Sequence, residues 1–379
     1  MSNKSKNYLT VIRQNGFCSV QDLGRMSSQH LGFSAGGAAD EYAFLYANYL
    51  LCLAQNFSQS DAHIHSVNHS PDNQLINHHL SLAQLEITLG QITFKAEQHC
   101  TIAITGADCS VCINDKPVSN WQIHQLNPHD IISFSQPKLG LHSYLAVVGG
   151  IQNKSWLGSR SQTSTEKHLG FNTAPADTIS PGYRIPLAEH CSMSAEKNES
   201  HNFSSSNPAS SNFDLEQASK IAFQQKQLTP NQFYNELGMP LTLRFIPQSL
   251  WYSFTEEQHA AFCENQFTIS AGSNRMGYRL SEIPDDVIPS STDSNYHLPK
   301  LSKPVTFGSI QLPSNNQPIV LMKERQTIGG YPVLGSVIQT DLFKLSQLRP
   351  GNKVQFLPTT LSFSQQQLMA FHQKFCFSI

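Results

Sequence analysis

The chain has 379 residues, a length that accommodates two domains of ordinary size. Apolar residues make up 39% of it, charged residues 14%, and the formal net charge is −2, so composition gives no electrostatic reason to expect a nucleic acid or an anionic membrane as a partner. The longest apolar run, residues 144–151, is too short to span a bilayer, and residues 1–15 lack the apolar core of a signal peptide, which together predict a cytoplasmic protein.

The first half of the chain predicts one helix followed by short strands. The helix begins at Asp40, a suitable N-cap, and continues to about Leu53. Its apolar face is formed by Leu45, Tyr49 and Cys52. Short segments rich in β-branched or aromatic residues, bounded by Gly, Asp, Asn or Pro, are typical of strands. The strands predicted in this way are Cys100–Thr105, Asp130–Phe134 and Ser143–Val148.

Two polar stretches interrupt the ordered pattern. Residues 58–79 carry five histidines, and we interpret them as a solvated insertion rather than a weak metal site, because no carboxylate or cysteine completes a ligand pattern. From Cys191 to Asn212 the chain is rich in Ser, Asn, Glu and His and nearly empty of large apolar residues, so it cannot bury enough surface to offset its ordering entropy. We predict a flexible polar linker over residues 189–235.

The second half again predicts strands, with one clear helix. Apolar and polar residues alternate along Leu241–Ile246, which is the period of a half-buried strand. Thr255 as N-cap and acidic residues in the first turn indicate a helix over Thr255–Glu264. Further strands are predicted over residues 266–270, 318–322 and 353–357. We therefore expect a mainly β chain with one domain over residues 8–188, a second over residues 236–360 and a C-terminal tail over residues 361–379.

Short catalytic motifs give little support to a self-contained enzyme of a common class. Gly32–Gly36 matches G-x-S-x-G, but the residues before it are polar and do not predict the buried strand that a nucleophile elbow requires. Cys109 and Cys112 form a C-x-x-C at the entry of a strand, where buried reduced thiols are favoured over a redox or metal site. No P-loop and no H-E-x-x-H occur, and Lys323 lacks the surroundings of a biotinylated lysine. We expect neither a metal site nor covalently attached biotin.

Three dense polar segments place arginine or amide side chains beside glycine, where a ligand can approach the backbone closely. They are Val20–Arg25, Ser273–Leu280 and Arg325–Pro332. The arginine fork suits a carboxylate or a phosphate, and Gly329-Gly330 could present successive N–H groups to an anion. An equally weighted alternative is that these segments are tight turns of a barrel. Their arginines would then pair with Asp22, Glu282 or Glu324.

Collinear motifs in both halves carry a resemblance to one family. They are residues 19–25, 29–32, 37–40, 47–48, 85–88, 104–108, 144–151, 157–161, 273–280, 308–313, 317–321 and 326–332. In this order they resemble the family variously called allophanate hydrolase subunit 2, the biotin-dependent carboxyltransferase-like family and the C-type subunits of 5-oxoprolinase. The resemblance implies two cyclophilin-like β-barrel subdomains with a few short helices, which agrees with the two groups of strands found from the residues themselves.

The resemblance also implies a function. It points to one subunit of an ATP-dependent 5-oxoprolinase complex, a hydrolase that cleaves 5-oxoproline to L-glutamate. The implied partners are the A-type and B-type proteins of 5-oxoprolinase, and the implied cosubstrate is ATP with Mg2+. Two alternatives stay open. One is the carboxyltransferase component of a biotin-dependent urea or amide carboxylase serving a separate biotin carrier, and the other is a regulatory protein that binds its B-type partner.

Site residues are expected from the resemblance and from the chemistry of a lactam, a poor electrophile whose phosphorylated form needs cationic partners. Arg275 and Arg279 are expected to supply positive charge. Gln326, with Gly329 and Gly330, is expected to hold an oxyanion or a phosphate. The remaining candidate binding residues are Asp22, Arg25, Ser273, Tyr278, Gln311 and Tyr331. The chain departs from the family pattern at Asn274, Glu324, Ile328 and Val333.

Overall fold

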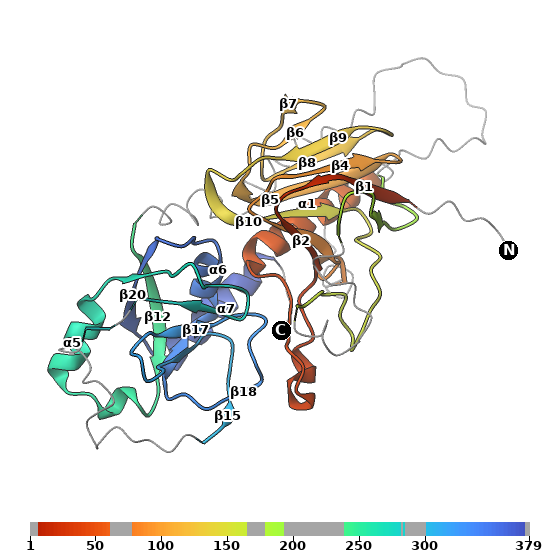
Figure 1. Ribbon diagram of the computed structural model, residues 1–379. Helices are drawn as coiled ribbons and strands as arrows, with labels where there is room; N and C mark the ends of the chain where they lie inside the picture. Colours follow the sequence, from red (N-terminus) through yellow and green to blue (C-terminus); the bar gives the residue numbers. More distant parts are fainter. Residues whose placement is uncertain are drawn as a thin grey trace, which may run out of the picture.

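The computed structural model describes residues 7–60, 78–164, 179–192, 239–281, 283–284 and 301–375, with side chains in all of these except residues 56–60. These residues form two lobes, which we call the first lobe (residues 7–192) and the second lobe (residues 239–375) (Figure 1). Both are built mainly of strands in curled sheets. The prediction of a mainly β chain with two cyclophilin-like β-barrel subdomains is confirmed. No helix within the described ranges combines the length and hydrophobicity needed to cross a bilayer.

The first lobe contains two antiparallel sheets that enclose an apolar core. Strand order is β11-β1-β4-β9-β6-β7 in one sheet and β2-β3-β10-β5-β8 in the other. Ile87, Phe94 and Ile104 are fully buried between them. The element bounds are β1 (Tyr8–Gln14), β2 (Phe17–Gln21), η1 (Met26–Leu31), β3 (Gln84–Thr88), β4 (Ile92–Ala96), β5 (Cys100–Asp108), β6 (Cys112–Ile113), β7 (Lys116–Pro117), β8 (Gln122–Leu126), β9 (Ile131–Phe134), β10 (Leu139–Val147) and β11 (Arg184–Pro186).

Helix α1 (Glu41–Ser60) packs on the sheet that contains β5 and β10 and lies toward the second lobe (Figure 1). It begins after Asp40, whose carboxylate accepts hydrogen bonds from the N–H groups of Tyr42 (3.1 Å) and Ala43 (3.2 Å). This confirms the predicted N-cap. The hydroxyl of Thr105 on β5 donates to the carbonyl of Ala43 (2.7 Å), which ties the helix to the sheet.

The second lobe contains a seven-stranded sheet of order β13-β20-β12-β19-β16-β17-β14 and a two-stranded sheet, β15-β18. In β12 the predicted alternation is confirmed, since Leu241, Leu243 and Phe245 are buried. The element bounds are β12 (Leu241–Pro247), η5 (Trp251–Ser253), α5 (Glu256–Glu264), β13 (Phe267–Thr268), β14 (Gly277–Arg279), β15 (Lys303–Pro304), β16 (Ser309–Gln311), β17 (Ile319–Leu321), β18 (Ile328–Gly329), β19 (Val333–Val337), α6 (Gln339–Ser346), β20 (Lys353–Pro358) and α7 (Leu361–Lys374).

Helix α7 contacts both lobes. It occupies Leu361–Lys374 of the C-terminal tail predicted over residues 361–379, and residues 376–379 lie outside the described part of the chain. Its Phe371 packs against Phe343 of α6, with ring centroids 5.0 Å apart, and Phe375 lies 6.0 Å from Tyr42 of α1. One apolar cluster therefore runs from α1 through α7 into the core of the second lobe.

The other sequence-based expectations have mixed outcomes. Every predicted strand overlaps an observed one, and α5 has the expected cap at Thr255, with a complete capping box. Gly32–Gly36 follows η1 rather than a strand, as the interpretation against a nucleophile elbow required. Residues 61–77 of the His-rich insertion and 193–235 of the linker lie outside the described residues. The proposed domain boundaries therefore stay predictions.

The two cysteines of the C-x-x-C motif differ in burial. Cys109 is buried, its Sγ lies 2.9 Å from the hydroxyl of Ser143, and burial raises its pKa to about 11. Cys112 is only partly buried. The cysteines in the described part of the chain are free thiols, and no three His, Cys, Asp or Glu side chains of that part are grouped to hold a metal ion.

Candidate functional site

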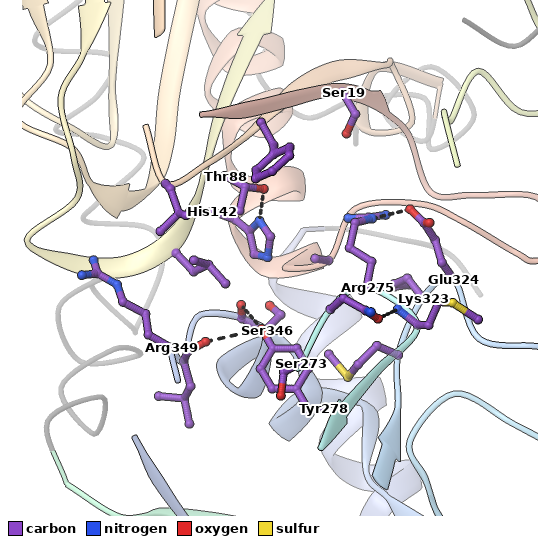
Figure 2. A pocket seen from close by; sticks show the side chains of 18 of the residues that line it. Ser19, Thr88, His142, Ser273, Arg275, Tyr278, Lys323, Glu324, Ser346 and Arg349 are labelled. Carbon is purple, nitrogen blue, oxygen red and sulfur yellow. Dashed lines mark hydrogen bonds and ion pairs between the residues drawn. The ribbon is translucent and has the colours of Figure 1, made fainter. Parts of the chain in front are cut away.

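A cavity of about 620 Å³ lies where the two lobes meet. The first lobe lines it with Ser19, Thr88 and His142, and the second lobe with residues of the β13–β14 turn, of the segment after β17 and of the end of α6 (Figure 2). Most of the remaining wall is apolar. Because neither lobe forms the cavity alone, its shape depends on how the lobes are held together.

Arg275, in the turn before β14, bridges the lobes at the wall of the cavity. Its Nε donates to the carboxylate of Glu324 (2.5 Å), its Nη1 forms an ion pair with Glu86, and its Nη2 donates to the carbonyl of Gly37 (2.7 Å). Two of these partners belong to the first lobe and one to the second. Each nitrogen of the guanidinium group therefore has an acceptor.

Glu86 is a buried carboxylate in the middle of β3. Its second oxygen accepts hydrogen bonds from the N–H of Ala39 (2.8 Å) and from the hydroxyl of Tyr144 (2.8 Å). Burial by itself would raise the pKa of this carboxyl, but the charge of Arg275 and the hydrogen bonds outweigh burial and hold the pKa below its ordinary value. Glu86 is therefore ionised at neutral pH.

Glu324 completes the bridge from the second lobe. Its other oxygen accepts hydrogen bonds from the hydroxyl of Ser164 (2.6 Å) and from the N–H of the same residue (3.1 Å). Glu324 therefore connects Arg275 of the second lobe with Ser164 of the first.

His142, on β10, is the titratable group on the first-lobe wall. Its Nδ1 lies 2.9 Å from the hydroxyl of Thr88 and 3.7 Å from Glu86 (Figure 2). Burial lowers the pKa of the imidazole and Arg275 adds to this effect, while Glu86 opposes it, and the pKa comes to about 4. His142 is therefore neutral at pH 7.

The cationic side chains that line the cavity already have partners. Besides Arg275, Lys323 donates to the carboxylate of Glu41 (3.1 Å), and Arg349 donates to the carbonyls of Gly140 (2.7 Å) and Pro137 (2.6 Å). A triphosphate needs several cations or backbone N–H groups free to face it. Among the described residues, the three cationic side chains that line the cavity are engaged with acceptors of the protein.

Of the residues singled out from the sequence, Arg275, Ser273 and Tyr278 line this cavity. The hydroxyl of Tyr278 donates to the carbonyl of Ser346 (3.0 Å). Arg279 is exposed, and its backbone N–H donates to the hydroxyl of Ser273 (3.0 Å). The Arg275–Glu324 ion pair is one that the alternative interpretation of tight turns named.

Asp22 and Arg25 belong to a separate buried cluster that braces the loop after β2. The carboxylate of Asp22 accepts hydrogen bonds from the hydroxyls of Ser159 (2.7 Å) and Ser161 (2.5 Å). Arg25 donates to the carbonyl of Ser161 (2.5 Å) and stacks over Trp156, 5.0 Å from the ring centre. Neither side chain lines the cavity.

The other candidates lie around the β15–β18 pair. Gly329 pairs with Lys303, and it lies against the side chain of Gln311, whose amide nitrogen would be 2.4 Å from a Cβ atom at Gly329. Gln326 and Tyr331 are exposed. None of these residues lines the cavity, so the expected convergence with Arg275 on one ligand is found only for Ser273 and Tyr278.

The sequence analysis did not single out Glu86, His142 or Tyr144 for the site. Glu86 and Tyr144 stood in motifs that carried the resemblance, without a role of their own. A charged residue between apolar neighbours in a strand was the one signal available, because such a residue needs a buried partner. For His142 the sequence offered no signal.

Comparison with known proteins gives the following similarities. Residues 65–358 match the family model described as carboxyltransferase domain, subdomain A and B. The chain is 28% identical over 354 residues to the C-type subunit of 5-oxoprolinase from Escherichia coli (strain K12), covering 93% of this chain and 92% of that protein. It is 22% identical over 359 residues to urea amidolyase of Lachancea kluyveri, covering 94% of this chain and 17% of that protein. The crystal structure of K. lactis urea amidolyase superposes with a TM-score of 0.71 at 21% identity, over 99% of this chain and 20% of that one.

Proposed function

Since the chain belongs to the family described as carboxyltransferase domain, subdomain A and B, we propose that it is one subunit of an ATP-dependent 5-oxoprolinase, which opens 5-oxoproline to L-glutamate. The observation that carries this proposal is sequence similarity. The chain is 28% identical to the Escherichia coli 5-oxoprolinase protein over 354 residues and 22% identical to the Lachancea urea amidolyase over 359 residues.

The cavity between the lobes is the proposed place for the lactam. Its walls are largely apolar, which suits the ring carbons of the lactam, and its polar groups are held in fixed positions by the Glu86–Arg275–Glu324 bridge. Fixed dipoles and charges favour catalysis because they need not reorganise during the reaction. Arg275 acts here by positioning the walls, since its own donors are already engaged.

We place the ATP of the complex outside this cavity. The engaged state of Arg275, Lys323 and Arg349 supports this placement. ATP hydrolysis would supply the driving force for opening a resonance-stabilised ring. An A-type 5-oxoprolinase protein, or its contact with this chain, is the proposed location of the nucleotide, and a B-type protein is the other proposed partner.

Co-expression with A-type and B-type 5-oxoprolinase proteins tests the proposal. The purified complex should release glutamate from 5-oxoproline only when ATP is present, with ADP formed in parallel. A complex that assembles but forms neither product would refute the assignment and favour a regulatory role in partner binding.

A carboxyltransferase role is the second candidate, and the family description and the likeness to urea amidolyase favour it. It predicts that the chain transfers the carboxyl group of N-carboxybiotin to urea or another amide. Measuring the loss of N-carboxybiotin with 5-oxoproline, urea or neither present separates the two candidates. Amide-dependent loss would support carboxyl transfer.

A further inference from the structure

The imidazole of His142 has two unlike sides. Nδ1 faces the hydroxyl of Thr88 at 2.9 Å and the carboxylate of Glu86 at 3.7 Å. A carboxylate beside a ring nitrogen favours the tautomer that carries its proton on that nitrogen. On this ground we assign the proton of the neutral ring to Nδ1, which leaves the lone pair on Nε2.

The Nε2 atom is the unused side of the ring. No hydrogen bond from any residue in the described part of the chain reaches it, although the side chain is only 5% exposed and lines the cavity. In Figure 2 the imidazole lies below Thr88 and faces the space between the two lobes. Nε2 is not one of the fully buried side-chain atoms without a partner in the described residues, so it opens onto the cavity, where the donor of a ligand can take the place of water.

The second lobe holds the backbone of His142 in place. The side-chain oxygen of Gln347 accepts hydrogen bonds from the N–H groups of Leu141 (2.7 Å) and His142 (2.9 Å). Its nitrogen donates to the carbonyl of His142 (2.9 Å) and to the carboxylate of Asp40 (2.7 Å). Gln347 thus uses both its side-chain oxygen and its side-chain nitrogen to hold the backbone of β10 from which the imidazole of His142 extends.

Burial keeps the imidazole of His142 neutral and therefore an acceptor, because it lowers the pKa of the ring. Glu86 on β3 and Arg275 before β14 act on it with opposite signs, and burial adds to the effect of Arg275. The ring therefore stays neutral at pH 7. A neutral ring of this tautomer can accept a hydrogen bond at Nε2 but cannot donate one there.

We propose that Nε2 of His142 accepts the hydrogen bond of an amide N–H, so that the cavity selects secondary amides, with the ring N–H of a lactam as the donor. Naming the donor as the N–H of a lactam, and the lactam as 5-oxoproline, rests on the proposed function, whereas the expectation that the ligand donates a hydrogen bond here rests on His142 alone. The apolar wall suits the ring carbons of such a ligand. Its members are Leu89, Leu141, Met276, Met322 and Leu348.

Binding of 5-oxoproline and of its N-methyl derivative to the reconstituted complex tests this inference. The wild-type complex should bind the N–H form at least about tenfold more tightly, as expected for one buried hydrogen bond. His142→Leu should reduce the preference to within about twofold, and His142→Gln, which keeps an acceptor near Nε2, should retain several-fold preference. If the methyl group were rejected by size alone, the preference would persist in His142→Leu, and that result would overturn the inference.

The remaining outcomes separate the two proposals. A wild-type complex that binds both forms equally, or neither, overturns the inference. A complex that discriminates between them through His142 but releases no glutamate with ATP overturns the 5-oxoprolinase assignment and leaves the inference standing. Nitrogen-15 NMR of the histidines adds a readout independent of activity, with His142→Gln identifying the signal. An imidazolium at pH 7, or a proton on Nε2, would contradict the proposed tautomer.

Discussion

At the scale of single residues, truncation of Arg275 should lower the free energy of unfolding markedly. Arg275→Ala would leave Glu86 and Glu324 buried without their cation, and Glu86 is only 1% exposed. Breaking a buried ion pair by removing one partner typically costs about 3–5 kcal/mol. Because the arginine is itself 21% exposed, we expect a loss of roughly 2–4 kcal/mol in the free energy of unfolding.

Arg279→Ala is the matched control for this measurement. Arg279 lies four residues further along, is exposed and bonds through its backbone, so its truncation should change stability by no more than about 0.5 kcal/mol. Urea denaturation of both variants gives the comparison. Equal stabilities of Arg275→Ala and wild type would show that the bridge does not hold the lobes.

His142 should make the protein less stable as the pH falls from 6.5 toward 4. In the folded protein the pKa of His142 is about 4, below the ordinary value of 6.5. Between these two pH values the imidazole is protonated in the unfolded chain and neutral in the folded one. Stability is full above pH 6.5 and declines below it, by on the order of 3 kcal/mol at pH 4.

The variant His142→Gln should remove this part of the pH dependence. Glu86 does not confuse the result above about pH 4.5, because its pKa is lowered from that value and its contribution is lost only as the pH falls below it. Denaturation midpoints between pH 6.5 and 5 are the measurement. Identical slopes for variant and wild type in that range would mean that His142 is not buried in its neutral form.

At the scale of elements, α7 is expected to stabilise both lobes through one aromatic residue. Phe371 is 4% exposed and contacts Phe343 of α6. Phe371→Ala should cost about 3–5 kcal/mol, the usual range for truncating a buried phenylalanine. Met369→Ala on the same helix, 52% exposed, should cost less than about 0.5 kcal/mol. A thermal scan that finds the two variants alike would place α7 outside the core.

The same helix shows where sequence patterns stop being informative. The alternation along β12 and the cap at Thr255 are local signals, and both predicted their elements correctly. Helix α7 is rich in glutamine and buries Phe371 as its one core residue between Leu361 and Lys374, so the helical spacing of Leu368, Phe371 and Phe375 gives only a short apolar stripe. Its helical state depends on contacts with α1 and α6 that are distant in sequence.

The candidate site, like the fold, could be predicted only where its residues are close together in the sequence. Ser273, Arg275 and Tyr278 could be selected because one short segment combines arginine, amide and glycine, and this segment does line the cavity. The partner of Arg275 on β3 is 189 residues away, and no local rule connects a strand carboxylate with a turn arginine at that separation. The Asp22 cluster contains the same types of residue as the predicted site, but the carboxylate of Asp22 forms its hydrogen bonds with residues of the first lobe.

At the scale of the whole molecule, three kinds of contact connect the two lobes. An apolar cluster continues from α1 into the second lobe, Gln347 bonds the backbone of β10, and the Arg275 bridge closes the cavity wall. A site assembled from both lobes is sensitive to their alignment, and a partner protein that contacts both of them would therefore influence it directly.

The most direct test of this account is glutamate formation by a complex of this chain with A-type and B-type 5-oxoprolinase proteins, measured with and without the chain. We predict that glutamate and ADP appear together from 5-oxoproline and ATP when all three proteins are present, and that omitting this chain abolishes glutamate formation. Equal glutamate formation without the chain, or none with it, would contradict the account.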